Sequence, residues 1–265
     1  MRVRLDISYD GTDFSGWAAQ PNRRTVQGVL EQSLATVLRL PSARLAVAGR
    51  TDAGVHATGQ VGHLDLPAAA WEQARERLVR QLAGVLPADV RVRAVTAVPA
   101  AFDARFSALW RRYVYRISTA PAGPEPLQRH EVLSWRRPLD VDAMASAARS
   151  LLGLNDFVAF CRRRAGGTTV RSLEAFVIER RGSEIVCDIR ADAFCHSMVR
   201  SLVGALLAVG DGRQPVEWPA NLLRRTARAD DVTVAPARGL TLVEVRYPPD
   251  AALAARAART RALRA

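Results

Sequence analysis

The sequence contains no lysine, so arginine supplies all 38 of its basic side chains. Cysteine is also scarce, with three residues that stand among apolar neighbours. Their odd number and their spacing, which matches no zinc motif, argue against a disulfide scaffold and against a metal site. We therefore expect Cys161, Cys187 and Cys195 to be ordinary core residues of a protein in a reducing compartment.

Long apolar runs are missing as well. No stretch approaches the ~20 residues that a helix needs to cross a bilayer, and the first residues show neither the apolar region nor the cleavage site of a secretory signal. With 265 residues, 49% hydrophobic and 24% charged, the chain has globular proportions and the length for one large domain or two small ones. We expect a soluble, cytoplasmic protein with no membrane partner.

Acidic residues are too few to balance the arginines. The 26 aspartates and glutamates leave a formal net charge of +12. Such a surplus on a folded domain favours a polyanionic partner, because each phosphate that the protein neutralises releases counterions. A nucleic acid fits better than a membrane, since no predicted helix combines a basic face with an aromatic edge that could enter lipid.

Hydrophobic periodicity gives the first half of the chain the order strand, helix, strand, strand, helix, strand. Residues 2–9 alternate between polar and apolar, and apolar residues then recur at helical spacing behind Thr25, a suitable N-cap. This order is that of the split βαβ or ferredoxin-like unit. The predicted elements are a strand at 2–9, a helix at 26–38, strands at 43–48 and 57–66, a helix at 70–84 and a strand at 90–98.

The second half repeats this order more loosely. Its predicted strands cover 109–118, 131–135, 174–181, 184–191 and 240–247, and its helices cover 140–152, 194–209 and 215–227. We therefore predict an α+β protein in which two ferredoxin-like halves, 1–104 and 105–248, form one extended mixed sheet flanked by helices. An Ala/Arg tail over 249–265 is expected to be helical or frayed.

The most unusual local sequence runs from Gly49 to His56, between two apolar strands. Its glycines permit positive φ and the close approach of a ligand, and it holds an aspartate and an arginine within three residues. Asp52 is a candidate nucleophile or base there, and Arg50 a candidate phosphate contact. The alternative is a plain hairpin connection in which polar side chains fold onto the backbone.

Two further segments carry candidate site residues. In the predicted strand around Tyr113, aromatic rings flanked by guanidinium groups suit base stacking and phosphate contact, although tyrosine is also an ordinary strand residue. Arg200 follows inward-facing positions of an apolar helix, where a half-buried charge requires a carboxylate. Asp52 is one that could serve, and the sequence cannot show whether the two residues meet.

These motifs closely resemble those of the tRNA pseudouridine synthase A family, the tRNA pseudouridine(38–40) synthases. The resemblance spans about residues 2–248 and keeps the family's order of motifs. The matching segments are Tyr9–Thr12 with Gly16–Trp17, Val26–Gly28, Gly49–His56, Thr58–Val61, Ala104–Ala108, Arg111–Tyr113, Asn155–Phe157, Thr169–Arg171, Phe194–Arg200 and Gly239–Leu240.

The resemblance implies a homodimer that binds the anticodon stem-loop of tRNA and converts uridines 38, 39 and 40 to pseudouridine without metal or cofactor. By position, Asp52 corresponds to the nucleophile and Tyr113 to the tyrosine that packs on the target uracil. Arg200 corresponds to the basic residue that pairs with the aspartate, and Arg50 to the arginine that assists extrusion of the base. The alternative is a non-catalytic RNA-binding module, since RRM sheets also stack bases, although the aromatic motifs of an RRM are missing.

Overall fold

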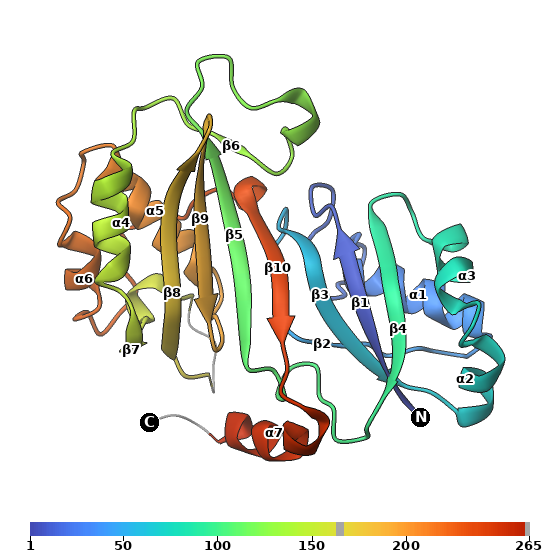
Figure 1. Cartoon of the computed structure of the whole chain (residues 1–265). Helices are drawn as coiled ribbons and strands as arrows, with labels where there is room; N and C mark the ends of the chain where they lie inside the picture. Colours follow the sequence, from blue (N-terminus) through green and yellow to red (C-terminus); the bar gives the residue numbers. More distant parts are fainter. Residues whose placement is uncertain (163–166, 263–265) are drawn as a thin grey trace. The chain divides into compact units, whose positions relative to one another are not determined.

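The computed structural model describes residues 1–162 and 167–262, and the chain divides into two compact units. The first unit comprises Met1–Leu109 together with Leu242–Ala262, and the second comprises Trp110–Thr241. Both are α+β, as Figure 1 shows by their arrowed strands and flanking helices. The α+β class with helices beside the sheets is therefore confirmed, and each unit is described here by itself.

The first unit is a small antiparallel sheet with helices. Strand β1 pairs with β3 on one side and β4 on the other, and the short β2 pairs with β3, which gives the order β4-β1-β3-β2 of a ferredoxin-like unit. Strand β10 lies beside β3. Its elements are β1 Arg2–Tyr9, α1 Val26–Leu38, β2 Ala46–Val47, β3 His56–Asp65, α2 Ala68–Ala74, α3 Leu78–Val85, β4 Val90–Val98, β10 Leu240–Arg246 and α7 Leu253–Arg261.

Local sequence accounts for the start of this unit. The apolar residues of β1 are all buried, and the polar residues between them are half-buried on the opposite face, as period-two alternation requires. Helix α1 begins behind Thr25, whose side chain accepts a hydrogen bond from the Gly28 amide at 3.3 Å and thereby caps the helix. The prediction of a single helix over 70–84 is wrong, because two shorter helices, α2 and α3, take its place.

The second unit is a sheet with strand order β5-β9-β8-β7, in which the short β6 runs parallel to β5. Helix α4 packs against β8 and against α5. The helix expected over 215–227 is confined to α6, and β7 was not predicted. The elements are β5 Trp110–Ser118, β6 Leu133–Ser134, α4 Val141–Arg149, β7 Gly153–Asp156, β8 Val170–Arg181, β9 Glu184–Ala191, α5 Met198–Gly210 and α6 Trp218–Leu222.

Helix α5 is the core of the second unit. Every residue of it except Arg200 is buried, so it is enclosed on all sides as a central helix of a larger unit must be. Gly204 lies against the segment that follows α6, where an added Cβ would lie 1.7 Å from the Thr233 carbonyl oxygen. This close approach requires glycine.

One expectation about the cysteines is wrong. Cys161 and Cys195 form a disulfide with their Cα atoms 5.7 Å apart, whereas Cys187 is free and buried. The two partners are 34 residues apart and follow different elements, so no local pattern signals the pairing. Cys161 and Cys187 are both completely buried in the core, as the sequence predicts, whereas Cys195 is half-buried. Burial raises the pKa of the free Cys187 thiol to about 12.

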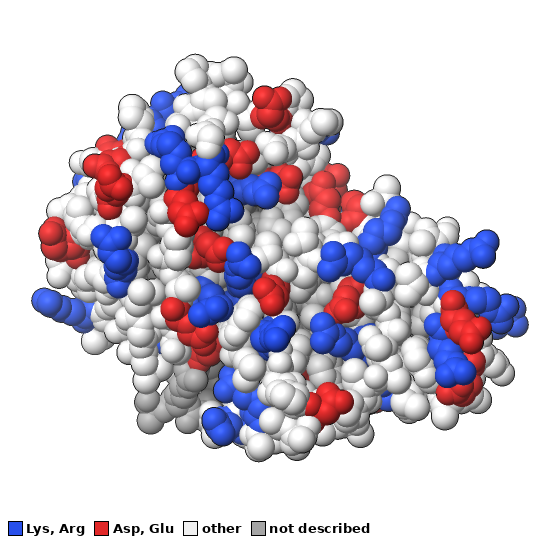
Figure 2. Space-filling model, in the orientation of Figure 1, with Lys and Arg blue, Asp and Glu red and all other residues white. Residues whose placement is uncertain are grey.

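None of the helices among the described residues has the length and apolar character of a membrane span. Charged side chains lie all over the face of the molecule in Figure 2, where arginines alternate with acidic residues. Several arginines of the strands lie within ion-pair distance of an acidic residue, such as Arg2 with Asp65 at 2.7 Å and Arg190 with Glu174 at 3.1 Å. Part of the arginine charge is therefore neutralised on the strands themselves, and the surplus of +12 remains.

Candidate active site

The loop between β2 and β3 holds the candidate nucleophile of the first unit. Its last part is a turn in which the Val55 amide donates to the Asp52 carbonyl at 3.2 Å. Gly54, the third residue of this turn, has φ +78°, a conformation that strongly favours glycine. Asp52 is half-buried and Arg50 is exposed, so both side chains lie in positions from which they can reach a ligand.

A network of buried polar side chains supports this loop. The Tyr9 hydroxyl lies 2.7 Å from Thr51 Oγ1, and the Gln60 amide donates both to the Tyr9 oxygen at 3.3 Å and to the Gly49 carbonyl at 2.8 Å. All three side chains are less than a tenth exposed. Burial raises the pKa of Tyr9 to about 12, so its hydroxyl stays protonated at neutral pH. The network therefore positions Gly49 and Thr51, the residues on either side of Arg50.

We expect Tyr9→Phe to reduce both stability and turnover. The variant leaves a buried Thr51 hydroxyl without its partner, which costs about 1–2 kcal/mol of unfolding free energy. A loosened loop should also lower kcat about tenfold with little change in KM, because small displacements of a reacting group are costly. Thermal unfolding and steady-state kinetics on tRNA measure the two effects.

Tyr247→Phe is the matched control for this prediction. It removes the same atom from a hydroxyl that donates to the Ala104 carbonyl at 2.7 Å, in the same unit but outside the loop. Its stability should fall by a similar amount and its kcat should not change. Equal kcat values in the two variants would show that the Tyr9 network has no positioning role.

Two glycines let a second segment, 10–17, approach the loop from the other side. Gly16 has φ +94°, and an added Cβ there would lie 3.0 Å from the Thr51 carbonyl oxygen. The Trp17 amide donates to that same oxygen at 3.0 Å. At Gly11 an added Cβ would lie only 2.0 Å from the Val55 carbonyl oxygen. Backbone therefore packs directly on backbone at both ends of the Asp52 turn.

His56 ties the end of the loop to the Asp10–Gly11 turn. Its Nδ1 accepts a hydrogen bond from the Gly11 amide at 3.1 Å, and Asp10 Oδ1 lies 3.1 Å from the same nitrogen. One nitrogen cannot accept and donate at once, so the two contacts are alternatives that depend on whether Nδ1 carries a hydrogen. No local pattern in the sequence indicates these contacts of His56.

Tyr113 lies in the second unit, on β5 and opposite Ile189 of β9. Its ring is 7% exposed and meets Phe194 edge to face, with ring centroids 5.2 Å apart. The buried residues of β5 alternate, and they include Arg111 and Tyr115 on the same face as Tyr113. These three side chains therefore share the buried face of β5.

Arg111 differs from a surface arginine because it is buried. Its Nη1 donates to the Asp192 carbonyl at 2.7 Å. The Asp192 carboxylate in turn accepts hydrogen bonds from the Ser172 and Ala193 amides at 2.9 and 2.8 Å. This carboxylate fixes the turn that leads to Phe194, and sequence spacing alone did not single it out.

Arg200 stands in the first turn of α5, in the second unit. It is half-buried, as predicted, and its Nε donates to the Ala235 carbonyl at 2.7 Å. Ser197, which precedes the helix, has φ +65°, so the chain turns sharply just before Arg200. Of the sequence-predicted site residues, Arg50 and Asp52 thus belong to the first unit, and Tyr113 and Arg200 belong to the second.

The family model for tRNA pseudouridine synthases matches residues 7–107 and 147–248. These ranges hold the Asp52 loop, the segments that support it, and Arg200. The chain belongs to the tRNA pseudouridine synthase family. It is therefore an isomerase that converts uridine to pseudouridine in tRNA.

Relatives match this pseudouridine synthase from end to end. A tRNA pseudouridine synthase A of Frankia casuarinae is 61% identical over 265 residues, which is all of this chain and 96% of the relative. One of Mycobacterium leprae is 54% identical over 275 residues, covering all of this chain and 96% of the relative. A Cbf5-Nop10-Gar1 complex matches 78% of this chain and 54% of that one at 12% identity with a TM-score of 0.33, a likeness too weak to support an argument.

Proposed function

We propose that this enzyme isomerises uridines 38, 39 and 40 of the anticodon stem-loop of tRNA, with Asp52 as the nucleophile and without a cofactor. The observation that carries the proposal is the support of the Asp52 loop by backbone and buried side chains on both sides. A hairpin connection without function has no need of a buried Tyr9–Thr51–Gln60 network, whereas a reacting carboxylate must be held in place. A pure RNA binder has no use for a carboxylate that repels phosphate.

The other site residues act on the target nucleotide. Arg50, exposed beside Asp52, assists extrusion of the base from the stack, which costs a few kcal/mol. Tyr113 packs on the uracil, and Phe194 holds its ring from the edge. Arg200, anchored through its Nε to the Ala235 carbonyl, pairs with the ionised aspartate during the reaction. These roles follow from the matching positions in the family motifs.

The reaction is an isomerisation in which atoms and electrons balance within the nucleotide. The N1–C1′ glycosidic bond breaks, the uracil rotates, a C5–C1′ bond forms, and the C5 proton is finally replaced by one on N1. Asp52 attacks C1′, attacks C6 of the uracil, or removes the 2′ proton, and the experiment below does not depend on which. No electron leaves the nucleotide, so no redox partner is required.

The proposal extends to the setting of the enzyme. The partner is the anticodon arm of tRNA, the enzyme acts as a homodimer, and it works in the cytoplasm, where tRNA is modified. The net charge of +12 supports binding to RNA phosphates, and we expect tRNA affinity to fall steeply with salt.

Tritium release from tRNA labelled at C5 of uridine tests the proposed function directly. Substitution at C5 expels one tritium for each pseudouridine formed, so the wild-type enzyme should release it from tRNAs with uridine at positions 38, 39 or 40. tRNAs in which these three uridines are replaced by cytidine serve as the control. Release that persists from the control tRNAs would contradict the proposed site, and tight binding without any release would favour the RNA-binding module.

The same assay tests Tyr113. Tyr113→Phe keeps the ring that packs on uracil, so KM for tRNA should stay within about twofold, whereas Tyr113→Ala should lose stacking worth about 1–3 kcal/mol. Slow release by Tyr113→Phe at saturating tRNA would give the hydroxyl a part in the chemistry, such as removal of the C5 proton. Wild-type rates in Tyr113→Ala would show that Tyr113 does not touch the base.

A further inference from the structure

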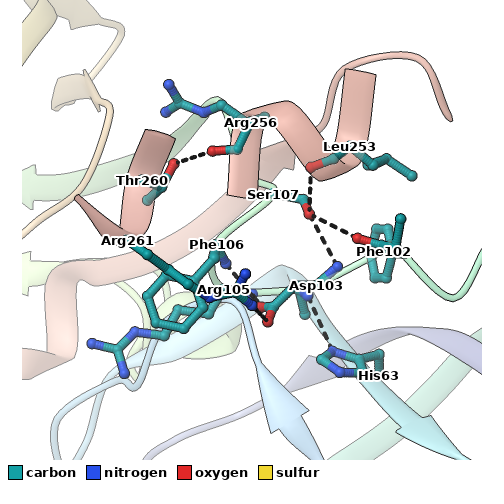
Figure 3. Close-up of polar contacts among 12 residues, drawn as sticks. His63, Phe102, Asp103, Arg105, Phe106, Ser107, Leu253, Arg256, Thr260 and Arg261 are labelled. Atoms are coloured by element: carbon teal, nitrogen blue, oxygen red, sulfur yellow. Dashed lines mark hydrogen bonds and ion pairs between the residues drawn. The ribbon is translucent and has the colours of Figure 1, made fainter. Parts of the chain in front are cut away.

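Helix α7 is an ordered part of the first unit. Its inner side carries Leu253 and Ala257, which are 1% and 3% exposed. Ser107 Oγ donates to the Leu253 carbonyl at 3.3 Å (Figure 3). Arg256 Nε donates to the Ala108 carbonyl at 3.0 Å. The helix is therefore docked on the segment 102–109 by apolar burial and hydrogen bonds.

The segment under α7 is itself held firmly. The Asp103 carboxylate accepts hydrogen bonds from the Arg105 and Phe106 amides, both at 2.9 Å, and His63 Nδ1 accepts one from the Ala104 amide at 3.1 Å. Burial lowers the pKa of His63, which favours the neutral ring that this bond requires. The backbone that carries the side chains of α7 and of this segment is thus held in place.

Arginines gather where these two elements meet. Residues 251–265 contain four arginines and no acidic residue, and Figure 2 shows arginine side chains over the place where Figure 1 draws α7. The guanidinium carbons of Arg105 and Arg261 lie 4.9 and 4.7 Å from the centroid of one ring, that of Phe106 (Figure 3). Asp103 pairs with Arg261 at 2.9 Å, which leaves positive charge in excess.

We propose that Arg105 and Arg261, together called the α7 surface, bind phosphates of the tRNA backbone away from the target uridine. Arg105 is exposed, and the Arg261 side chain is 54% exposed despite its ion pair. Arginine forks bind phosphate oxygens in pairs. The proposal rests on the proposed function, because it assigns the same substrate a second area of contact.

The charge and the packing of α7 favour RNA as the occupant of the α7 surface. Its excess of positive charge complements the phosphates of an RNA backbone. The apolar side of α7 is already buried in the protein, so the helix has no hydrophobic edge left to enter a lipid surface, as an interfacial helix must have. The α7 surface thus adds affinity for tRNA and takes no part in the chemistry.

Salt-dependent tRNA binding tests the proposal. Arg105→Gln and Arg261→Gln should each weaken binding of full-length tRNA about three- to tenfold and lower the slope of log K against log salt by about one. The double variant should lower the slope by about two. The kcat at saturating tRNA should not change. Arg80→Gln, which removes an exposed arginine from α3 of the same unit, should change affinity less than twofold and leave the slope as it is.

Several results would overturn the proposal. If Arg105→Gln and Arg261→Gln behave like Arg80→Gln, the α7 surface does not bind RNA. If Arg261→Gln lowers the unfolding temperature while the salt slope stays that of the wild type, the arginine only holds α7 to Asp103. Loss of binding to phosphatidylserine vesicles with an unchanged tRNA slope would assign the surface to membranes. Failure of the wild type to release tritium is a separate result, which concerns the proposed function alone.

Discussion

Asp52→Asn should abolish turnover and leave tRNA affinity within a few-fold of the wild type. The amide has nearly the shape of the carboxylate, and the substitution leaves in place the hydrogen bonds that the backbone carbonyls of Gly49, Thr51 and Asp52 accept. The variant therefore keeps these supports of the loop and loses the negative oxygen that attacks. Removal of a nucleophile typically reduces kcat by ~10³-fold or more.

Single-turnover tritium release measures this loss, and tRNA binding by fluorescence anisotropy measures the retained affinity. Asp13→Asn is the matched control, because it removes an exposed carboxylate from the segment that packs on the loop and should leave kcat unchanged. Substantial turnover by Asp52→Asn would show that another group is the nucleophile. A large loss of affinity would instead show that the side chain orders the RNA site.

Gly11→Ala should disrupt the same loop by a steric route. The new methyl group would stand 2.0 Å from the Val55 carbonyl oxygen, so the backbone of one segment must move away from the other. We expect a loss of about 3 kcal/mol or more of unfolding free energy, since overpacking against backbone cannot be relieved by a rotamer change. A shift of ~1 Å at Asp52 should also lower kcat about a hundredfold.

Gly84→Ala is the matched control, because it makes the same glycine-to-alanine change where no steric clash results. Gly84 stands in α3 with no atom within 4 Å of an added Cβ, so the variant should be neutral or stabilised by up to about 1 kcal/mol. Chemical denaturation and steady-state tritium release measure both variants. Wild-type stability and kcat in Gly11→Ala would mean that the 10–17 segment does not support the loop as described.

The sequence by itself determined the elements whose causes are local. The alternation of β1, the Thr25 cap of α1 and the glycines around Asp52 each depend on neighbours within a few residues, and all were predicted. The motif order also determined the family and with it the candidate roles of Asp52, Tyr113 and Arg200. Side-chain period, capping and turn chemistry act along the chain, so they can be read along the chain.

The tertiary structure alone decided what holds those residues. Gln60 and Tyr9 are 51 positions apart, Cys161 and Cys195 are 34 apart, and Ser107 meets Leu253 across 146 positions. Such contacts form only when whole elements pack, and buried polar groups then take whatever partner the packing brings to them. For that reason the sequence did not predict the network under Asp52, the disulfide or the docking of α7, although it contains every residue that forms them.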